Sequence, residues 1–333
     1  DALYYRPLAQ SGPTRPHTAV TLAGGWCWFT EVEVLSRAGS AKIVQASDVP
    51  ADALQRLISP RAPIAGLSMD HPRVMGILNA TPDSFSDGGV NAAAMDAVTS
   101  GRAMQTAGVD LLDVGGESTR PGAATVEIDA EVSRVAPVIA GLREAGVRCP
   151  ISVDTRKAEV AKAAHDAGAN LVNDVSGFTY DPALAPLCAA EGVPICIMHA
   201  LGDPATMQQN PHYDDVVLDV YDYLQARVTA LSAIGIPRER MVIDPGIGFG
   251  KTEAHNLALL RNLSLFHGIG CPILLGVSRK RFIGTIGQAP EPAARAPGSI
   301  AVGLAALAQG VQILRVHDVA DTAQALRLWT AAR

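Results

Sequence analysis

Polar and charged side chains follow eight apolar, strand-like runs of this sequence, each at the point where a run ends. They are Asn79, Glu117 to Arg120, Asp154, Asn173 with Asp174, His199, Asp244, Ser278 to Lys280, and Arg315 with His317. In a barrel of alternating strands and helices, the carboxyl ends of the strands surround one pocket, where such folds carry out their chemistry. The pattern therefore predicts one ring of functional side chains around one site.

Three members of this ring, Asp154, Asn173 and Asp244, carry oxygens and an amide at the ends of different runs. A carboxylate accepts two neighbouring N–H groups, such as those on the edge of a 2-amino-4-oxopyrimidine ring. A ligand that lacked this pattern would leave buried polar groups unsatisfied and would bind more weakly. The three residues therefore predict a site for a flat heterocycle. The alternative is that each one only caps the helix that follows it.

The cations of the sequence are typical of an anion site. Ser278 to Lys280 and the pair Arg315 and His317 follow the last two runs, where barrels most often bind phosphate. Arg315 and His317 alternate along one strand, so we expect them to point the same way. A guanidinium, an imidazole that can be protonated and a nearby metal would stabilise a diphosphate leaving group. Arg120 lies among glycines and a proline, which predicts a mobile loop with a further anion-binding group.

Two other polar residues have interpretations that depend on their surroundings. Asn79 ends the first run and offers a neutral oxygen suited to Mg²⁺, which keeps most of its waters and is balanced by substrate phosphates. It can equally be a residue that only caps the following turn. Asp113 lies inside the second run, so we expect it to be structural. It needs a local donor, because an unpaired buried carboxylate is costly.

The segment from Pro245 to Thr252 resembles two nucleotide-binding motifs and matches neither. A Walker A loop needs four residues between its first glycine and its Gly-Lys pair, whereas three separate Gly246 from Gly250. A dinucleotide motif would need a glycine at position 251, which is Lys251. We instead expect a flexible loop that places Phe249 over the pocket.

The elements that must position these residues alternate regularly from Arg73 onward. Strands are expected at 74–79, 109–114, 151–154, 170–173, 194–199, 241–244, 273–276 and 311–315, and helices at 92–107, 127–145, 157–167, 214–233, 300–308 and 318–330. Apolar strands without polar alternation are buried on both faces, as parallel strands are. Eight such units predict an α/β fold of the (β/α)8 TIM barrel type. A doubly wound open sheet is the alternative, but no G-x-G-x-x-G follows the first strand.

Residues 1–72 do not follow this rhythm. We expect them to form an N-terminal extension or small subdomain of unknown role that packs on a barrel of residues 73–333. Trp26, Trp28 and Phe29 predict a buried patch in the extension, and a helix is expected at 51–58. The net charge is −6 with no basic stripe, and no apolar run reaches about 18 residues. We therefore expect a cytoplasmic protein that binds no nucleic acid and no membrane.

Several segments closely resemble the signature sequences of the dihydropteroate synthase family. They are 79–89 (NATPDSFSDGG), 115–122 (GGESTRPG), 152–155 (SVDT), 173–175 (NDV), 198–199 (MH), 244–251 (DPGIGFGK), 276–280 (GVSRK) and 315–319 (RVHDV). The resemblance covers about residues 73–333 with all motifs in order. It implies a pterin-binding TIM barrel that joins (7,8-dihydropterin-6-yl)methyl diphosphate to 4-aminobenzoate in folate biosynthesis, by Mg-assisted dissociative loss of diphosphate.

The resemblance also implies roles for the matching residues. The pterin would be bound by Asp154, Asn173, Met198, Asp244 and Lys280, and the diphosphate by Asn79, Arg120, Arg315 and His317, with Mg²⁺ as the cofactor at Asn79. The 4-aminobenzoate site would contain Thr119, Arg120, Pro121, Phe249, Ser278 and Lys280, and mobile loops would contribute Thr81, Pro82, Phe85 and Ser86. The catalytic residues would be Arg315, His317, Lys280 and Asp154.

The resemblance further implies a homodimer whose other partners are small-molecule substrates. Two departures from the family pattern, at 200–203 (ALGD) and at Arg281, can alter loop packing or the affinity for 4-aminobenzoate analogues such as sulfonamides. One alternative is a pterin-barrel methyltransferase that acts on methyl-tetrahydrofolate. Another is a paralogue that binds pterin without turnover. The role of His199, catalytic or structural, stays open.

Overall fold

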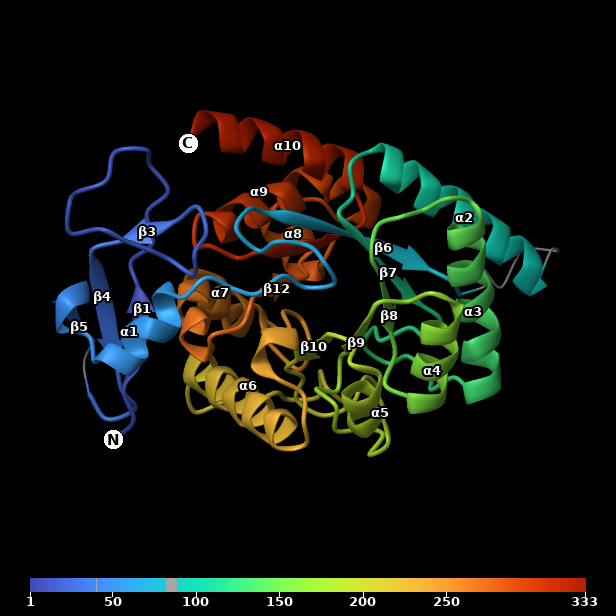
Figure 1. Ribbon diagram of the computed structural model, residues 1–333, viewed down its shortest axis with the longest axis horizontal. Coiled ribbons are helices and arrows are strands. Elements are labelled where there is room, and N and C mark those ends of the chain that lie inside the picture. Colours follow the sequence, from blue (N-terminus) through green and yellow to red (C-terminus); the bar gives the residue numbers. More distant parts are fainter. Residues whose placement is uncertain (40, 82–88) are drawn as a thin grey trace.

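A parallel sheet of eight strands forms the centre of the computed structural model, which describes residues 1–39, 41–81 and 89–333 (Figure 1). The strands are β6 (Arg73–Asn79), β7 (Leu111–Gly115), β8 (Ile151–Asp154), β9 (Leu171–Asp174), β10 (Ile195–Met198), β11 (Met241–Asp244), β12 (Leu274–Leu275) and β13 (Ile313–Val316). Their order in the sheet is β11, β10, β9, β8, β7, β6, β13, β12. A parallel bridge between Ile243 and Ile273 then joins the two outer strands. The sheet thereby closes into the predicted TIM barrel.

Helices cover the outside of the barrel (Figure 1). They are α2 (Gly89–Thr106), α3 (Ile128–Glu144), α4 (Ala158–Ala167), α5 (Leu184–Glu191), α6 (Val216–Ala233), α7 (Glu253–Arg261), α8 (Arg281–Ile286), α9 (Ala296–Leu307) and α10 (Val319–Ala332). The sequence prediction lacks α5, α7 and α8, because helices of six to nine residues show too few turns for a period to be recognised. None of the helices in the described ranges has the length and apolar character needed to cross a membrane.

Side chains inside the barrel form layers of opposite character. A buried apolar layer at the amino ends of the strands contains Met75, Leu111, Leu171, Cys196, Val242, Leu274 and Ile313. Two positions further along the same strands lie Ile77, Asp113, Asn173, Met198, Asp244, Gly276 and Arg315. Because side chains alternate along a strand, this second set faces the same interior. The barrel interior therefore changes from apolar to polar within one step toward the carboxyl ends.

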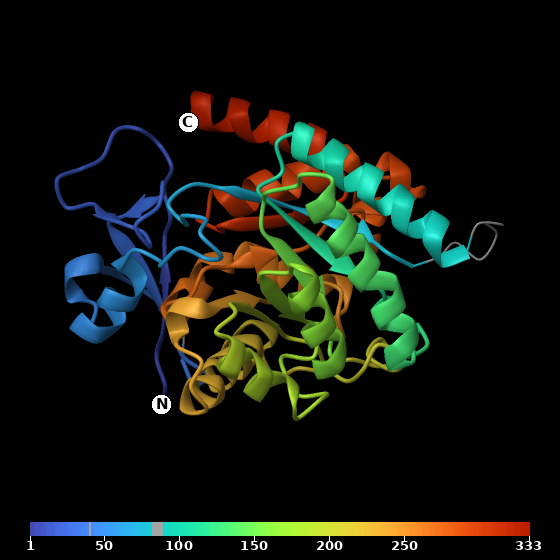
Figure 2. The same cartoon turned by 45° about the vertical axis from the view of Figure 1, so that its right-hand side comes forward.

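The N-terminal segment packs against the barrel with small antiparallel sheets and one helix (Figures 1 and 2). Its elements are β1 (Tyr4–Pro7), β2 (Val20–Thr21), β3 (Trp28–Phe29), β4 (Glu31–Leu35), β5 (Lys42–Gln45) and α1 (Ala51–Ile58). The indole of Trp26 donates to the carbonyl of Leu307 on α9 at 2.8 Å. Ile64 and Met69 are buried in the apolar layer at the amino ends of the barrel strands. Residues 64–69 thus cover the end of the barrel opposite the polar layer.

We predict that Ile64→Ala lowers the free energy of unfolding by about 2–5 kcal/mol, because truncating a buried aliphatic side chain also leaves a cavity. Ile64 is 1% exposed, at the amino end of the barrel. The matched control is Ile43→Ala on β5, where the side chain is 60% exposed and a change below about 0.5 kcal/mol is expected. Urea unfolding followed by circular dichroism measures both. Equal effects would contradict the packing of Ile64 into the barrel.

Candidate active site

A guanidinium and two carboxylates from three strands meet in the polar layer. Arg315 on β13 donates from Nε to Oδ2 of Asp113 at 2.7 Å and from Nη2 to Oδ2 of Asp154 at 3.3 Å. The amide of Asn173 donates to the same oxygen of Asp113 at 3.1 Å. The Asp113 side chain is fully buried, so its charge depends on these donors. The expected donors of Asp113 therefore come from the ring of strand-end residues itself.

Asp113 belongs to the site, whereas the sequence was interpreted as giving it a structural role only. Its second oxygen, Oδ1, is buried and has no hydrogen-bond partner within the described ranges. Such an oxygen can accept a hydrogen bond from a ligand in the barrel mouth. The signal lay in the alternation of β7, since Leu111, Asp113 and Gly115 share one face and Leu111 is in the interior layer.

The strand register arranges four predicted pterin-binding residues as two pairs. Asp154 on β8 is the register partner of Asn173 on β9, and Met198 on β10 is the partner of Asp244 on β11. Asn173 is also the partner of Cys196 on β10, so the second pair lies one step closer to the carboxyl ends than the first. Neighbouring strands of a sheet lie about 4.8 Å apart. All four side chains are buried. These two pairs, called the row below, present two carboxylates, an amide and a thioether at the interior of neighbouring strands.

Burial makes the two carboxylates of this row receptive to hydrogen-bond donors. It raises the pKa of Asp154, with a further contribution from the charge of Asp113, while Arg315 opposes the shift. Burial also raises the pKa of Asp244, and the Lys280 ammonium opposes it. Oδ1 of Asp244 accepts from the backbone N–H of Gly246 at 2.8 Å. A ligand that donates N–H groups to these oxygens would replace part of the hydration that burial removed.

Lys280 completes the pocket beside Asp244. Its ammonium donates to the carbonyl of Ile247 and lies 4.9 Å from the centre of the Phe249 ring. Burial lowers the pKa of Lys280 to about 8, while the charge of Asp244 opposes this shift. The preceding residue, Arg279, adopts the left-handed conformation at φ 58° and pairs with Asp318 at 2.6 Å. This fixed turn separates Ser278 and Lys280, which both border the site.

His317 lies beside Ser278, in surroundings that disfavour its protonated form. Ser278 Oγ accepts from the backbone N–H of His317 at 3.0 Å and lies 2.8 Å from its Nδ1. Burial, followed by the charges of Arg279 and Arg315, lowers the pKa of His317 to about 4. The prediction that His317 can be protonated therefore applies to a site that holds an anion. Beside an anion, the imidazolium would be stabilised.

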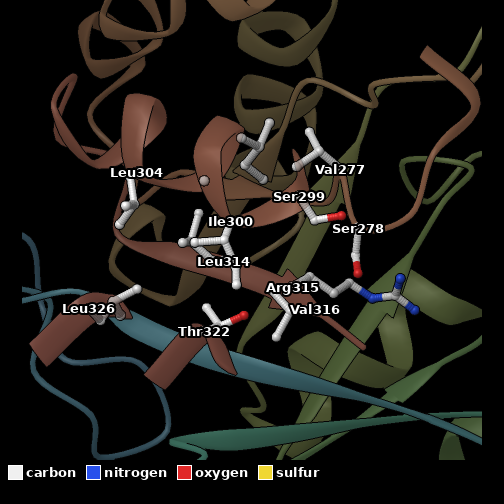
Figure 3. Close-up of a pocket in the computed structure, with 12 residues that line it drawn as sticks. Val277, Ser278, Ser299, Ile300, Leu304, Leu314, Arg315, Val316, Thr322 and Leu326 are labelled. Carbon is white, nitrogen blue, oxygen red and sulfur yellow. The ribbon is translucent and has the colours of Figure 1, made fainter. Parts of the chain in front are cut away.

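Arg315 lies at the edge of an apolar pocket between the last barrel strands and the helices α9 and α10. Figure 3 shows the guanidinium extending away from the apolar side chains of Leu304, Leu314 and Leu326, on the side of the Ser278 hydroxyl. The Arg315 side chain remains 24% exposed although Asp113 is fully covered. It therefore lies at the border between the buried carboxylates and the open mouth of the barrel.

The loop that carries Thr119, Arg120 and Pro121 is fixed at its base. Oε2 of Glu117 accepts from the backbone N–H of Val126 and from the ammonium of Lys157, both at 2.8 Å. Within the loop, Arg120 and Pro121 are exposed and Thr119 is half-buried. The sequence did not indicate this anchor, because the lysine that binds both Glu117 and the carbonyl of Val126 comes from the next β/α unit.

Not every predicted residue lies in this cluster. Asn79, at the end of β6, and Thr81 are exposed, and Pro82, Phe85 and Ser86 lie outside the described residues. Arg281 is exposed at the first position of α8. The departure at 200–203 lies next to Pro204, whose carbonyl accepts from the N–H of Gly122 at 2.7 Å. That departure therefore borders the loop of Arg120.

A metal would find few protein ligands in this site. Within the described ranges, no group of three or more His, Cys, Asp or Glu side chains is placed to hold a metal ion. The amide oxygen of Asn79 is exposed at the end of β6. A single neutral oxygen fits Mg²⁺ if the substrate phosphates and water supply the remaining ligands.

Comparison with known proteins agrees with this geometry. Residues 75–317 match the family model described as "Pterin binding enzyme". The chain is 44% identical over 262 residues to dihydropteroate synthase of Escherichia coli strain K12, which covers 79% of this chain and 92% of that protein. It is also similar to the solved structure of Xanthomonas albilineans dihydropteroate synthase with 4-aminobenzoic acid, at a TM-score of 0.76 and 46% identity, over 82% of this chain and 97% of that one. The same enzyme in complex with 7,8-dihydropteroate gives a TM-score of 0.73 and 44% identity, over 82% and 98% of the chains.

We predict that diphosphate raises the pKa of His317 from about 4 by at least one unit, because a nearby anion stabilises the charged imidazolium. NMR titration of the histidine side chains, assigned with His317→Gln, measures this shift. The titration of His212, whose side chain is 85% exposed, serves as the internal control and should move much less. An unshifted His317 would show that the anion binds elsewhere.

Proposed function

Since the chain belongs to the dihydropteroate synthase family of pterin-binding enzymes, we propose that it condenses (7,8-dihydropterin-6-yl)methyl diphosphate with 4-aminobenzoate. The products are 7,8-dihydropteroate and diphosphate. The chain is a transferase of this family's type. The observation that carries the proposal is the row of Asp154, Asn173, Met198 and Asp244, which lies directly beside a group of cations. One side of the pocket suits a flat heterocycle and the other suits its leaving group.

The pterin would bind by its polar edge to the buried row. Asp154 and Asp244 accept from ring N–H and amino groups, and Asn173 supplies one donor and one acceptor. The ammonium of Lys280 can donate to a ring oxygen or nitrogen, and Met198 packs on the ring face. A competing ring with the wrong pattern of donors leaves these groups unpaired, which penalises it strongly. The acidic row thereby supplies selectivity for the pterin.

The chemical barrier lies in the departure of diphosphate. An arylamine is a neutral nucleophile at pH 7, so the reaction needs no strong base to activate it. Charge develops on the departing oxygen, and cations placed in advance stabilise it most effectively. Arg315, His317 and Arg120 supply this stabilisation. We propose that the path is dissociative, with the C–O bond breaking before the arylamine nitrogen bonds to the pterin methylene carbon.

Arg315 can contact the buried carboxylates and the diphosphate at the same time. Its Nε and Nη2 are bound to Asp113 and Asp154, while Nη1 makes no hydrogen bond within the described ranges. Nη1 can therefore donate to a phosphate oxygen while the other nitrogens keep the carboxylates paired. His317 can donate a second hydrogen bond to the anion and take up a proton as negative charge accumulates beside it.

Asn79 would hold Mg²⁺ together with the substrate phosphates. When bound, the ion would neutralise part of the diphosphate charge and so improve the leaving group. The exposed position of Asn79 at the end of β6 supports this role, because the other ligands must come from substrate and water. The 4-aminobenzoate would bind between Phe249, Ser278 and Lys280 on one side and Thr119 to Pro121 on the other.

We predict that the protein releases diphosphate when it is incubated with the pterin diphosphate, 4-aminobenzoate and Mg²⁺. Release must depend on both substrates and must fall when EDTA removes the metal. The measurement is a coupled diphosphate assay, with formation of 7,8-dihydropteroate followed by chromatography. A protein that binds the pterin without release would be a non-catalytic paralogue. Methyl transfer from methyl-tetrahydrofolate would instead indicate the methyltransferase alternative.

We predict that Arg315→Lys lowers kcat about 100-fold, because a lysine cannot donate to the carboxylates and to the leaving group at once. Its positive charge still balances Asp113, so the Kd for the pterin should change less than about threefold. Arg315→Ala is the matched control, and it should weaken pterin binding as well because Asp113 and Asp154 lose their cation. Stopped-flow kinetics and pterin fluorescence separate the two quantities. Equal losses of kcat and pterin affinity in Arg315→Lys would argue against a leaving-group role.

A further inference from the structure

The lysine in the segment that resembles a nucleotide-binding motif points into its own loop. Lys251 is 1% exposed, although it follows the glycine-rich segment 245–250 at the mouth of the barrel. Its Nζ lies 2.8 Å from the carbonyl oxygen of Gly246 and 3.0 Å from that of Phe249. It also lies 2.8 Å from Nδ1 of His199, the residue that follows β10. The loop therefore surrounds the amine, and its N–H groups are not available to bind a phosphate.

These three short contacts match the three donors of the amine, and a longer fourth contact reaches the carbonyl oxygen of His199 at 3.4 Å. An ammonium has three N–H donors, which match two carbonyl oxygens and an imidazole nitrogen. A neutral amine would keep the same contacts by donating to the carbonyls and accepting from Nδ1–H. His199 is buried and lies edge-on to the ring of Tyr223 at 4.8 Å between centroids. Its Nδ1 is engaged by Lys251, so His199 is tied to the loop and not to the barrel mouth.

The backbone of the loop is packed too tightly to move independently of His199. A Cβ at Gly246 would lie 1.8 Å from the carbonyl oxygen of His199, and one at Gly250 would lie 2.7 Å from atoms of Leu201. Both glycines have positive φ angles, 71° and 67°, a region that only glycine adopts without strain. The loop therefore needs glycine at these positions in order to lie against the chain that follows β10.

Side chains from the surrounding elements bind most of the remaining polar groups. Gly248 N–H donates to Asn256 Oδ1 and Gly250 N–H donates to Gln208 Oε1, both at 2.8 Å, and Tyr213 donates to the Gly250 carbonyl at 2.7 Å. These bonds restrain the loop that the sequence predicts to be flexible, because its buried backbone groups have partners in the surrounding elements.

We propose that Lys251, together with His199, is a positioning pair that holds Phe249 in place for the arylamine. The inference rests on the proposed function. Lys251 donates to the carbonyls of Gly246 and Phe249, and Lys280 donates to the carbonyl of Ile247, which lies between them in the chain. The aromatic ring that borders the 4-aminobenzoate site is thus fixed by a buried amine that touches neither substrate.

The test is a double-mutant cycle between Lys251 and Phe249. We expect Lys251→Met to raise the KM for 4-aminobenzoate at least tenfold, with the Kd for the pterin changed less than threefold. Phe249→Ala should raise the same KM, and adding Lys251→Met to it should cost less than a further threefold, because both changes act through one ring. Lys162→Met is the matched control, since its side chain is 47% exposed, and it should change neither constant. Additive effects, or an unchanged KM in Lys251→Met, would overturn the proposal.

A second pair of variants keeps the test valid if Lys251→Met does not fold. His199→Asn retains an acceptor near the position of Nδ1 and should keep the KM within threefold, whereas His199→Leu should raise it at least tenfold. Equal effects of the two would overturn the proposal. Hydrogen exchange of peptide 245–251 provides a readout without turnover, and it should be faster in His199→Leu than in His199→Asn. If the wild type released no diphosphate, the proposed function would fail, and this exchange difference would still decide whether the pair fixes the loop.

Discussion

The buried contact of Arg315 with Asp113 and Asp154 is the interaction on which the site depends. Two carboxylates inside a barrel repel each other and lose their hydration, so they need a cation with fixed geometry. Removing one member of such a group typically costs about 3–5 kcal/mol. The contact joins the last strand to two early ones, across 202 and 161 residues of chain. It can form only once β13 has paired with β6, so the pairing of the last barrel strand with the first also assembles this part of the site.

The Arg315 guanidinium affects the pKa values of an acidic and a basic side chain on the two sides of the site, here called its acidic half and its basic half. It opposes the rise in the pKa of Asp154 and contributes to the low pKa of His317. Asp154 therefore remains a better hydrogen-bond acceptor, and the neutral form of His317 is favoured. A diphosphate that enters beside Arg315 would reverse the second effect and favour protonation of His317. In the proposed reaction, one charge would thereby link recognition of the heterocycle to stabilisation of its leaving group.

Sequence reasoning predicts the features that depend on local pattern. The eight strands, the longer helices and the residues at strand ends such as Asp154 and Asp244 follow from apolar runs and from the geometry of parallel strands. Features that depend on contacts between distant segments were not predictable in this way. Asp113 lies in a strand interior and is recognised only by its donors, and Lys251 is recognised only by the carbonyls around it. The placement of residues 1–72 likewise depends on an apolar surface at the end of the barrel, to which seven different strands each contribute a side chain.

The two loops that we propose to border the arylamine site differ in their hydrogen bonds, and this difference suggests different roles for them. The loop of Phe249 is bound along its length by Lys251, Gln208 and Asn256. The loop of Arg120 is anchored at its base by Glu117, and its far part has the bond from Gly122 to the carbonyl of Pro204. A wall that is fixed in advance adds little ordering cost on binding, whereas a weakly held loop must be ordered by the substrate. In the proposed reaction, the Phe249 side would therefore supply affinity for the ring, and the Arg120 side would become ordered only when a ligand compensates for the cost.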